Sequence, residues 1–257
     1  MRNLSPEVLA DLDAATCNAN ELRLTAQLEP ARYRAVDKII QAAGGKWNRR
    51  ARCHVFDDDA RAAIDQIVLT GGVGAKQELG QFDSPPAVVA RVMELAAIEP
   101  GMWVLEPSAG VGALAIEAIR AGGLLRAYEI DARRAAKLIV AVTALTECVA
   151  TACICETGDF LVAAQTLPRQ FDRCVMNPPF ARQADIAHVL AAAACVKGGG
   201  RLVAVMSAAV RFRQDKVTRQ FRDWLHALGG HVEDLPPGSF KVSGTTVNAC
   251  IVAVDIP

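Results

Sequence analysis

The amino-acid sequence predicts an α/β protein in which a small N-terminal α+β module precedes a larger domain built on a mostly parallel sheet. From residue 81 to the C-terminus, seven short segments have the apolar character of strands, and Ala-rich stretches with helical spacing separate the early ones. This alternation favours a parallel sheet that is covered on both faces. Residues 1–69 have a different pattern, and residues 70–80 carry four glycines without periodicity, which is typical of a linker.

The N-terminal module contains three predicted helices and one predicted strand. Residues 5–17 and 31–45 have helical spacing, and a glycine pair ends the second of these stretches. Residues 44–56 read as a turn, a basic segment and a short strand. Residues 57–68 read as a helix with acids in its first turn, where they suit the helix dipole. The glycines that follow lack the GxxxxGK[ST] spacing of a phosphate loop, so the linker interpretation is favoured.

The larger domain has seven predicted strands. They cover residues 103–108, 126–130, 151–156, 173–177, 201–207, 232–235 and 246–254. Residues 112–123 and 132–149 are the predicted helices between the first three strands. The sequence shows no internal repeat that would favour a solenoid or another repeat architecture.

Composition restricts the classes of protein that fit. The chain has 257 residues and a formal net charge of zero, so a local basic patch must meet any anionic partner. No apolar run approaches the roughly 20 residues of a membrane span, and the N-terminal segment has no apolar signal core. The eight cysteines include no CxxC pair. We therefore expect reduced thiols, no metal site and a cytoplasmic location without membrane contact.

Residues that follow the predicted strands are the candidates for a site, because open α/β sheets bind ligands beyond the carboxyl ends of their strands. Gly110 and Gly112 follow the first strand, Glu129 ends the second, and Asp159 follows the third. Singly, these residues also fit a loose GxGxxA loop, a solvated helix cap and an N-cap. Together they favour a nucleoside cofactor, with Glu129 accepting from ribose hydroxyls, Asp159 from an adenine amino group, and Phe160 covering the ring.

The fourth predicted strand ends at Asn177, Pro178, Pro179 and Phe180. Proline has no N–H to donate to a sheet ladder, so this strand must stop in a rigid tip. With this motif, the sequence resembles the S-adenosylmethionine-dependent methyltransferases that have a Rossmann-like, seven-stranded sheet. It is most similar to the amino-methylating DNA adenine methyltransferases of the compact phage and mobile-element type.

Five stretches carry this resemblance: FDSPPAVVARVMELA before the first strand, VLEPSAGVGALA, AYEID, GDFL and FDRCVMNPPF. The NPPF motif is typical of methylation of a planar nitrogen, and rRNA guanine and glutamine methyltransferases share close variants of it. The resemblance implies S-adenosylmethionine as the cofactor. The implied cofactor-binding residues are Phe82, Ser84, Pro85, Glu106, Pro107, Ser108, Ala109, Gly110, Gly112, Glu129, Ile130, Asp159, Phe160 and Asn177.

The chemistry of an exocyclic amino group explains the motif. Its lone pair is delocalised into the base, so two acceptors placed around its hydrogens favour a pyramidal, nucleophilic nitrogen. The side-chain oxygen of Asn177 and the backbone carbonyl of Pro178 are the predicted acceptors. Pro179 helps to fix them in advance, and Phe180 is expected to stack on the target ring. This scheme requires no metal and no covalent protein intermediate.

Two basic clusters are candidates for phosphate contacts. Seven Lys and Arg residues stand against Asp37 between Arg32 and Arg52, for a net charge of +6, and five stand against Asp215 between Arg211 and Arg222, for +4. The alternative is a solvated helix face, or helix packing for Phe212. The predicted nucleic-acid contacts are Lys46, Trp47, Arg49, Arg50, Arg52, Arg211, Phe212, Arg213 and Lys216.

The favoured function is methylation of the adenine 6-amino group in DNA, with the base flipped out of a duplex. Only 77 residues follow Phe180, which leaves no room for a large target-recognition domain, so we expect low or short-site specificity. An RNA base methyltransferase uses the same motifs. A non-catalytic nucleic-acid-binding protein on this fold is a weaker alternative, because the NPPF motif and the cofactor loop are intact. A nicotinamide-dependent oxidoreductase is weaker still, because the NPPF tip has no role in its mechanism.

Overall fold

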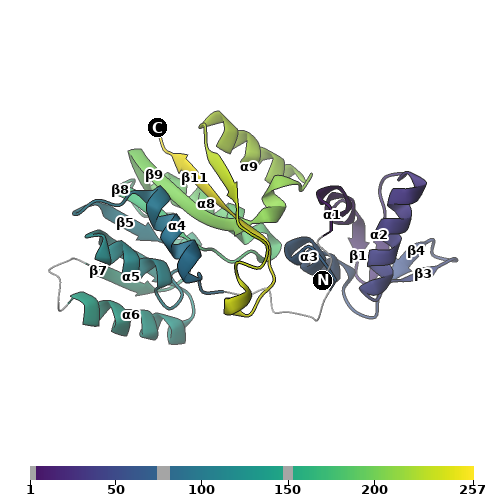
Figure 1. Ribbon diagram of the computed structural model, residues 1–257, viewed down its shortest axis with the longest axis horizontal. Helices are drawn as coiled ribbons and strands as arrows, with labels where there is room; N and C mark the ends of the chain where they lie inside the picture. The colour runs from purple at the N-terminus through teal and green to yellow at the C-terminus, as the bar shows by residue number, and fades with distance from the viewer. Residues whose placement is uncertain (1–3, 74–81, 147–152) are drawn as a thin grey trace. The chain divides into compact units, whose positions relative to one another are not determined.

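The structure, a computed structural model, describes residues 4–73, 82–146 and 153–257. The chain divides into two units (Figure 1). Residues 1–79 and 208–222 make up the first unit, and residues 80–207 and 223–257 make up the second. Segment 208–222, which the sequence pattern assigned to the larger domain, thus groups with the N-terminal module. Most of the predicted linker and the start of the third predicted strand lie outside the described residues.

The first unit combines helices with an antiparallel sheet. Its strands are arranged in the order β1-β2-β4-β3 and are only three residues long. The sequence predicted one strand here. The helices are α1 (Pro6–Asp13), α2 (Pro30–Ala42) and α3 (Ala60–Thr70), and the strands are β1 (Thr16–Asn18), β2 (Glu21–Arg23), β3 (Lys46–Asn48) and β4 (Cys53–Val55).

The helices of the first unit begin at side-chain caps. Ser5, Glu29 and Asp59 accept hydrogen bonds from backbone N–H groups in the first turns of α1, α2 and α3. Asp59 therefore caps α3 and does not lie in its first turn as predicted. Gly71 ends α3 in the left-handed conformation, with φ of 69°, a conformation that glycine adopts without steric cost.

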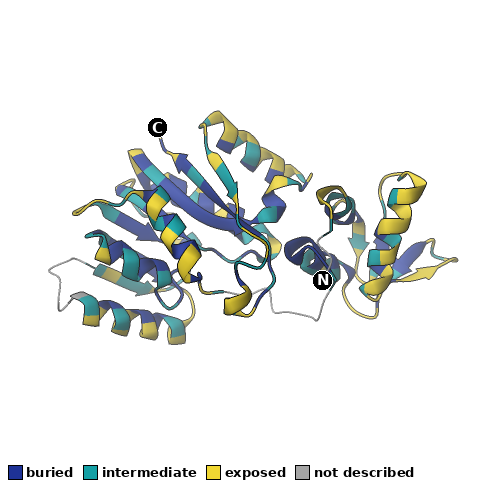
Figure 2. Ribbon diagram, in the orientation of Figure 1, coloured by how far each residue is buried: buried dark blue, intermediate teal, exposed yellow. Residues whose placement is uncertain are grey.

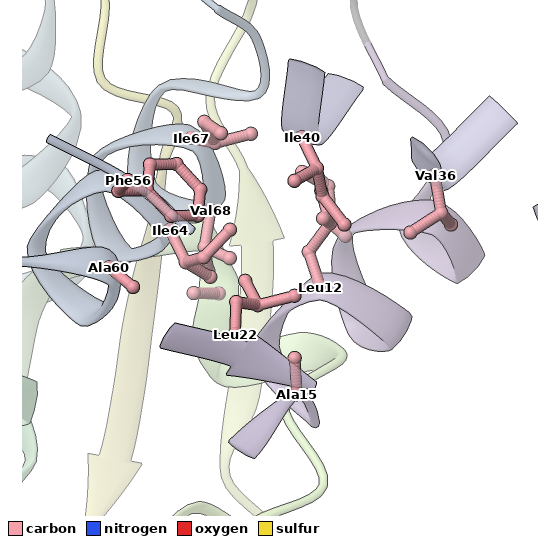
Figure 3. Close-up of a cluster of buried hydrophobic side chains, with 12 residues drawn as sticks. Leu12, Ala15, Leu22, Val36, Ile40, Phe56, Ala60, Ile64, Ile67 and Val68 are labelled. Carbon is pink, nitrogen blue, oxygen red and sulfur yellow. The ribbon is translucent and has the colours of Figure 1, made fainter. Parts of the chain in front are cut away.

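A continuous cluster of buried side chains forms the core of the first unit (Figure 3). Leu12, Ile40 and Ile64 bring α1, α2 and α3 together over Leu22 of β2 (Figure 3). Ala209 belongs to the same cluster, and Phe212 packs against it. The side chains of Ala209 and Phe212 therefore take part in the core of the first unit, which explains why segment 208–222 groups there.

The second unit contains the predicted seven-stranded, mostly parallel sheet. Its strand order is β10-β11-β9-β8-β5-β6-β7, and β11 runs antiparallel to both β9 and β10. The strands are β5 (Trp103–Glu106), β6 (Leu124–Glu129), β7 (Cys153–Thr157), β8 (Phe171–Met176), β9 (Val196–Ser207), β10 (His231–Asp234) and β11 (Ala249–Asp255).

Helices cover this sheet in two layers. Helix α5 packs between α4 and α6 on one face, whereas α7 and α8 contact each other on the other (Figure 1). The central strands between the layers are mostly buried (Figure 2). These helices are α4 (Pro86–Ala96), α5 (Ala113–Arg120), α6 (Ala132–Thr146), α7 (Phe160–Ala163) and α8 (Ala184–Cys195); α9 (Lys216–Ala227) begins in the first unit and ends in the second, and the 3₁₀ turns are η1 (Ala181–Gln183), η2 (Ala208–Arg211) and η3 (Lys241–Ser243).

The topology creates a switch point between β5 and β8. From β5 the chain proceeds outward through β6 to β7, and then returns to build β8 and β9 on the other side of β5. The helices after β5 and β8 therefore leave in opposite directions, which opens a crevice at the carboxyl ends of these strands. Among the described residues, no helix is both long and apolar enough to cross a membrane.

Candidate active site

A pocket lies at the predicted place, at the carboxyl ends of β5, β6 and β8 in the second unit. It brings together most of the residues that the sequence predicted to bind a cofactor. The lining residues are Phe82, Asp83, Ser84, Glu106, Ser108, Ala109, Gly110, Ala113, Leu114, Glu129, Arg134 and Asn177. The predicted residues Pro85, Pro107, Gly112, Ile130, Asp159 and Phe160 are not among them.

The loop between β5 and α5 turns on two glycines. Gly110 and Gly112 have φ of 61° and 100°, a region that other residues adopt only with strain. The N–H of Gly110 donates to Glu129 Oε2 at 2.7 Å, which ties this loop to the end of β6. A Cβ on Gly112 would lie 2.9 Å from Leu138 Cδ1. Gly112 therefore supports the loop from behind and does not line the pocket.

Two buried carboxylates lie side by side in this pocket. Glu129 is 2% exposed, and its Oε1 accepts from the N–H of Asp131 at 2.8 Å. Glu106 is 1% exposed, and its Oε2 has no hydrogen-bond partner among the described residues. Burial, and secondly the charge of Glu129, raise the pKa of the Glu106 carboxyl well above its ordinary value. An unpartnered buried polar atom facing a pocket is a position where a polar ligand can bind.

Arg134 is the main pocket residue that the sequence interpretation missed. Its Nη2 contacts Asp83 Oδ1 at 2.6 Å, and its Nε lies 4.0 Å from Glu129 Oε2. A Cβ on Gly110 would come within 2.5 Å of the Arg134 guanidinium, so this side chain lies directly on the glycine loop. The sequence signal that could have identified Arg134 is its positive charge near the start of α6, a position that the helix dipole disfavours. The space left in the pocket is about 20 Å³, enough for about one water.

The tip at the end of β8 has a defined orientation. Asn177 Nδ2 donates to the carbonyl of Phe82 at 2.9 Å and to Ser84 Oγ at 3.0 Å. Because a carbonyl oxygen can only accept, these bonds fix which end of the amide is the nitrogen. Asn177 Oδ1 and the Pro178 carbonyl accept no hydrogen bond from any described residue. Two neighbouring acceptors are therefore available at the end of β8.

The residues after the tip are strained. Arg182 and Gln183 have φ of 54° and 60°, a pair of non-glycine residues in the left-handed region. Such strain is concentrated at functional sites. Phe180 is only 6% exposed, so the structure does not present its ring as the open stacking surface that the sequence predicted. Pro178 is buried and Pro179 is half-buried, which anchors the tip in the second unit.

Asp159 and Phe160 differ from their predicted roles. Asp159 Oδ1 accepts from the N–H of Leu161 at 2.8 Å, which makes it the N-cap of α7. Phe160 is 2% exposed and packs against Tyr128 and His188, with ring centroids 5.6 Å and 6.2 Å away. The Phe160 ring is therefore a core residue here. For Asp159, the N-cap interpretation that the sequence left open is the one observed.

The second basic cluster needs a correction at Arg213. This side chain is only 5% exposed and forms ion pairs with Asp13 at 3.0 Å and Asp65 at 3.2 Å. It is a structural residue of the first unit and does not contact phosphate, because two carboxylates already hold its guanidinium. Phe212 is half-buried against the core, as the packing alternative proposed. Arg211 and Lys216 remain exposed.

In the first basic cluster, Arg32 is half-buried and paired with Asp11, whereas the predicted nucleic-acid contacts lie on the surface of the first unit. Every predicted contact in it is exposed: Lys46, Trp47, Arg49, Arg50 and Arg52. The three arginine guanidiniums form no ion pair with any residue that the structure describes, whereas Lys46 lies 3.7 Å from the exposed carboxylate of Asp57. Arg49, Arg50 and Arg52 therefore present positive charge that no ion pair with a described residue neutralises.

Comparison with known proteins identifies the family. The family model described as "Methyltransferase small domain" matches residues 80–227, which is more than half of the chain. The chain belongs to this family. Its cofactor is S-adenosylmethionine, in agreement with the sequence prediction, and the pocket residues fit such a cofactor through the glycine loop and the buried Glu106 and Glu129. The predicted Rossmann-like, seven-stranded sheet is confirmed.

Three known proteins illustrate the similarity. "Ribosomal RNA small subunit methyltransferase A" of Leifsonia xyli subsp. xyli is 32% identical over 120 residues, which span 46% of this chain and 42% of that protein. A modification subunit of a putative type I restriction enzyme from Vibrio vulnificus has a TM-score of 0.58 at 13% identity. The match covers 90% of this chain and 59% of the Vibrio vulnificus chain. A putative RNA methyltransferase from Pyrococcus horikoshii has a TM-score of 0.53 at 20% identity, covering 71% and 90%.

Proposed function

We propose that this methyltransferase-family protein transfers a methyl group from S-adenosylmethionine to the exocyclic 6-amino group of adenine in DNA, with low or short-site sequence specificity. The observation that carries the proposal is the pair of available acceptors at the end of β8. Asn177 Oδ1 and the Pro178 carbonyl accept no hydrogen bond from a described residue, whereas the Asn177 amide nitrogen is held by Phe82 and Ser84.

These two acceptors suit an amino group bound to an aromatic ring. Each accepts one N–H of the substrate, which draws the nitrogen lone pair out of conjugation and directs it at the methyl donor. S-adenosylmethionine supplies a methyl group on a sulfonium, which leaves as a neutral thioether. The hydrogen bonds from Asn177 to Phe82 and Ser84 hold the side chain in place before substrate arrives, so the site pays little reorganisation at the moment of reaction.

Cofactor binding requires Arg134 to move. The pocket leaves about 20 Å³ while Arg134 lies on the glycine loop and contacts Asp83, whereas ligand pockets usually measure roughly 300 Å³ or more. The Arg134 side chain is 24% exposed and Asp83 46% exposed, so their ion pair is accessible to water and costs little to break. Glu129 and the unpartnered Glu106 oxygen are then the polar groups available to the cofactor.

The first unit supplies the contact with nucleic acid in this proposal. Its exposed cluster at 46–52 carries arginines without ion pairs, which is what phosphate binding needs in a chain of zero net charge. DNA is favoured as the substrate because the similarity to the Vibrio vulnificus modification subunit extends over 90% of this chain. The duplex base must leave its stack to reach the tip.

An RNA base is the second candidate substrate. The relative from Leifsonia xyli is named as a ribosomal RNA methyltransferase, and the structure from Pyrococcus horikoshii as a putative RNA methyltransferase. The acceptor pair at Asn177 and Pro178 serves an RNA amino group equally well, since the chemistry is the same. The two candidates differ in which nucleic acid the first unit binds.

A methyl-transfer assay tests the proposed function. Purified protein is incubated with S-adenosylmethionine carrying a labelled methyl group and with DNA, RNA or neither, and the nucleosides are resolved by mass spectrometry. We expect label in N6-methyladenine from DNA. Asn177→Ala should lower the rate by about 100- to 1,000-fold, the usual effect of deleting one preorganised hydrogen-bonding group, while cofactor affinity is retained. Label found only in RNA or protein would refute the DNA assignment.

Ser84→Ala is the matched variant for this assay. It removes one of the two hydrogen bonds that hold the Asn177 amide and leaves the acceptor oxygen itself unchanged. The expected loss is therefore smaller than that of Asn177→Ala, and it should appear in kcat. An equal loss for both variants would mean that Asn177 acts through its position in the fold and not as an acceptor.

A further inference from the structure

We infer that a second pocket, on the first unit, takes an unpaired nucleobase of the substrate strand; the inference rests on the proposed nucleic-acid substrate. The pocket has a volume of about 270 Å³, just below the roughly 300 Å³ at which ordinary small-molecule sites begin. It lies entirely within the first unit, between β2, β3 and the start of α2. The residues that carry the argument are Leu22, Leu28, Tyr33, Trp47, Arg52 and His54.

Two aromatic rings border this pocket and are unusually open to water. Trp47 is 50% exposed and Tyr33 is 39% exposed, although both are large enough to contribute to a core. Tyr33 continues the stripe of α2 that buries Val36 and Ile40, yet it lies outside the core cluster. Aromatic faces left open beside a cavity are typical of sites where bases stack.

The tryptophan is held in place before any ligand arrives. Trp47 pairs with His54 across β3 and β4, and their rings meet edge to face with centroids 5.0 Å apart. His54 is 1% exposed, and its Nε2 donates to Asp37 Oδ1 at 2.7 Å. The ring beneath Trp47 therefore cannot rotate freely, which lowers the entropy cost of binding on Trp47.

Positive charge surrounds the open aromatic faces. The turn between β3 and β4 is shaped by Asn48, whose Oδ1 accepts from the N–H groups of Arg50 and Ala51 at 3.0 Å each. Arg52 then adopts φ of 53°, in the left-handed region. Arg52 itself lines the pocket, and its guanidinium has no ion-pair partner among the described residues. A backbone phosphate next to a base in the pocket would meet this charge.

These features together select an unpaired base over a duplex. The phosphates of a duplex are accessible to arginines, but its bases are stacked and offer no free face to Trp47 or Tyr33. An unstacked base offers a flat π-face for the aromatic rings and an adjoining phosphate for Arg52. The apolar floor formed by Leu22 and Leu28 suits a planar ring that has left water.

The test compares two DNA ligands that have the same phosphates. Binding of the full chain to a short fluorescent single strand, and to an abasic strand of the same length, is measured by anisotropy. Trp47→Ala should weaken binding of the normal strand by roughly 5- to 100-fold, the range for loss of one stacking ring, and leave the abasic strand unaffected. Trp47→Phe, which keeps an aromatic face, should restore most of the affinity. Trp47 lies on the edge strand β3 and is half exposed, so both variants are expected to fold.

Other outcomes overturn the inference. Equal effects of Trp47→Ala on both strands, or no effect on either, would show that no base stacks on Trp47. Weakening of the abasic strand alone would also contradict it. The methyl-transfer assay separates this result from the proposed function. If strand binding depends on Trp47 but DNA is not methylated, the proposed function is refuted and the base-binding pocket stands. If DNA is methylated but strand binding does not depend on Trp47, only the base-binding pocket is refuted.

Discussion

At the scale of single residues, the site depends on polar atoms to which the fold either gives a hydrogen-bond partner or gives none. Glu129 is buried and holds the N–H groups of Gly110 and Asp131, so its position is fixed by the backbone. Glu106 is equally buried but has one oxygen without a partner. Asn177 has both amide hydrogens engaged and its oxygen available. Glu106 and Asn177, which carry these open atoms, both line the pocket.

The Glu106→Gln variant tests how much stability the protein loses when the buried Glu106 carboxyl ionises. Burial and the charge of Glu129 raise the pKa of Glu106 in the folded state above its ordinary value of 4.5. The folded protein therefore holds this proton more tightly than the unfolded chain. Its contribution to stability is complete below that ordinary value and is lost as the pH rises towards the raised pKa.

The variant keeps the shape of Glu106 and cannot ionise. We expect wild type and Glu106→Gln to have similar melting temperatures in mild acid, and the variant to become more stable than wild type as the pH rises, by at most about 1.4 kcal/mol per pH unit. Thermal unfolding without cofactor across this range measures the difference. Parallel curves for the two proteins would contradict the raised pKa of Glu106.

The sequence identified those site residues whose role depends on the motif in which they lie. Gly110, Glu129 and Asn177 follow strand ends, and the structure places all three at one pocket. Arg134 was missed and Arg213 was misassigned for the same physical reason. The role of a long charged side chain depends on which carboxylate it meets, and Asp83 and Asp13 lie far away in the sequence.

At the scale of elements, the segment that follows β9 deserves its own test. It contains η2 and the start of α9, and it packs in the first unit through Ala209, Phe212 and Arg213. Arg213 separates the carboxylates of Asp13 and Asp65, and the burial of Asp13 raises the pKa of that acid despite its cationic neighbours. Arg213 neutralises these acids together with Arg61, which lies 3.8 Å from Asp13 and 3.7 Å from Asp65.

Arg213→Ala should lower stability by about 1–3 kcal/mol, because it removes the nearer cation from the buried Asp13 and leaves only the longer contact with Arg61. Lys216→Ala is the matched control, since this cation belongs to the same segment and is exposed; its effect should stay within about 0.5 kcal/mol. Chemical denaturation of both variants measures the difference. A stable Arg213→Ala protein with weakened DNA binding would restore the original prediction of a phosphate contact.

A second prediction at the scale of elements concerns the glycine loop between β5 and α5. Gly112→Ala forces a side chain into φ of 100° and against Leu138, so it should cost at least about 1–2 kcal/mol. Gly158→Ala is the control, because Gly158 has no atom within 4 Å of an added Cβ and no positive φ. Thermal unfolding should show a clear loss for the first variant only. Equal losses would mean that the loop tolerates a side chain at Gly112.

Element prediction succeeded where the hydrophobic pattern was long enough to read. All seven strands of the second unit were predicted, with ends that differ from the observed ones by a few residues. In the first unit, β1, β2 and β3 were missed, because three-residue strands are too short to show alternation. Their sheet forms through pairing and through the core around Leu22, which no local window contains.

At the scale of the whole molecule, the proposed function gives the chain two different kinds of contact with a nucleic acid. The second unit holds the acceptor pair at Asn177 and Pro178 beside a cofactor pocket. The first unit holds exposed arginines and the Trp47 pocket. The family and the sheet followed from sequence motifs, but the Trp47 pocket did not, because its walls come from four separate elements, β2, β3, β4 and α2, that only folding brings together.

Single-molecule sequencing of DNA from cells that express this protein tests the central claim most directly, because it reads the modified base and its context together. Cells with the wild-type chain should contain N6-methyladenine in many short sequence contexts. Cells with equal amounts of Asn177→Ala should lack it. Unmodified adenine in the presence of folded wild-type protein, or modification of another base, would contradict methylation of the adenine amino group in DNA.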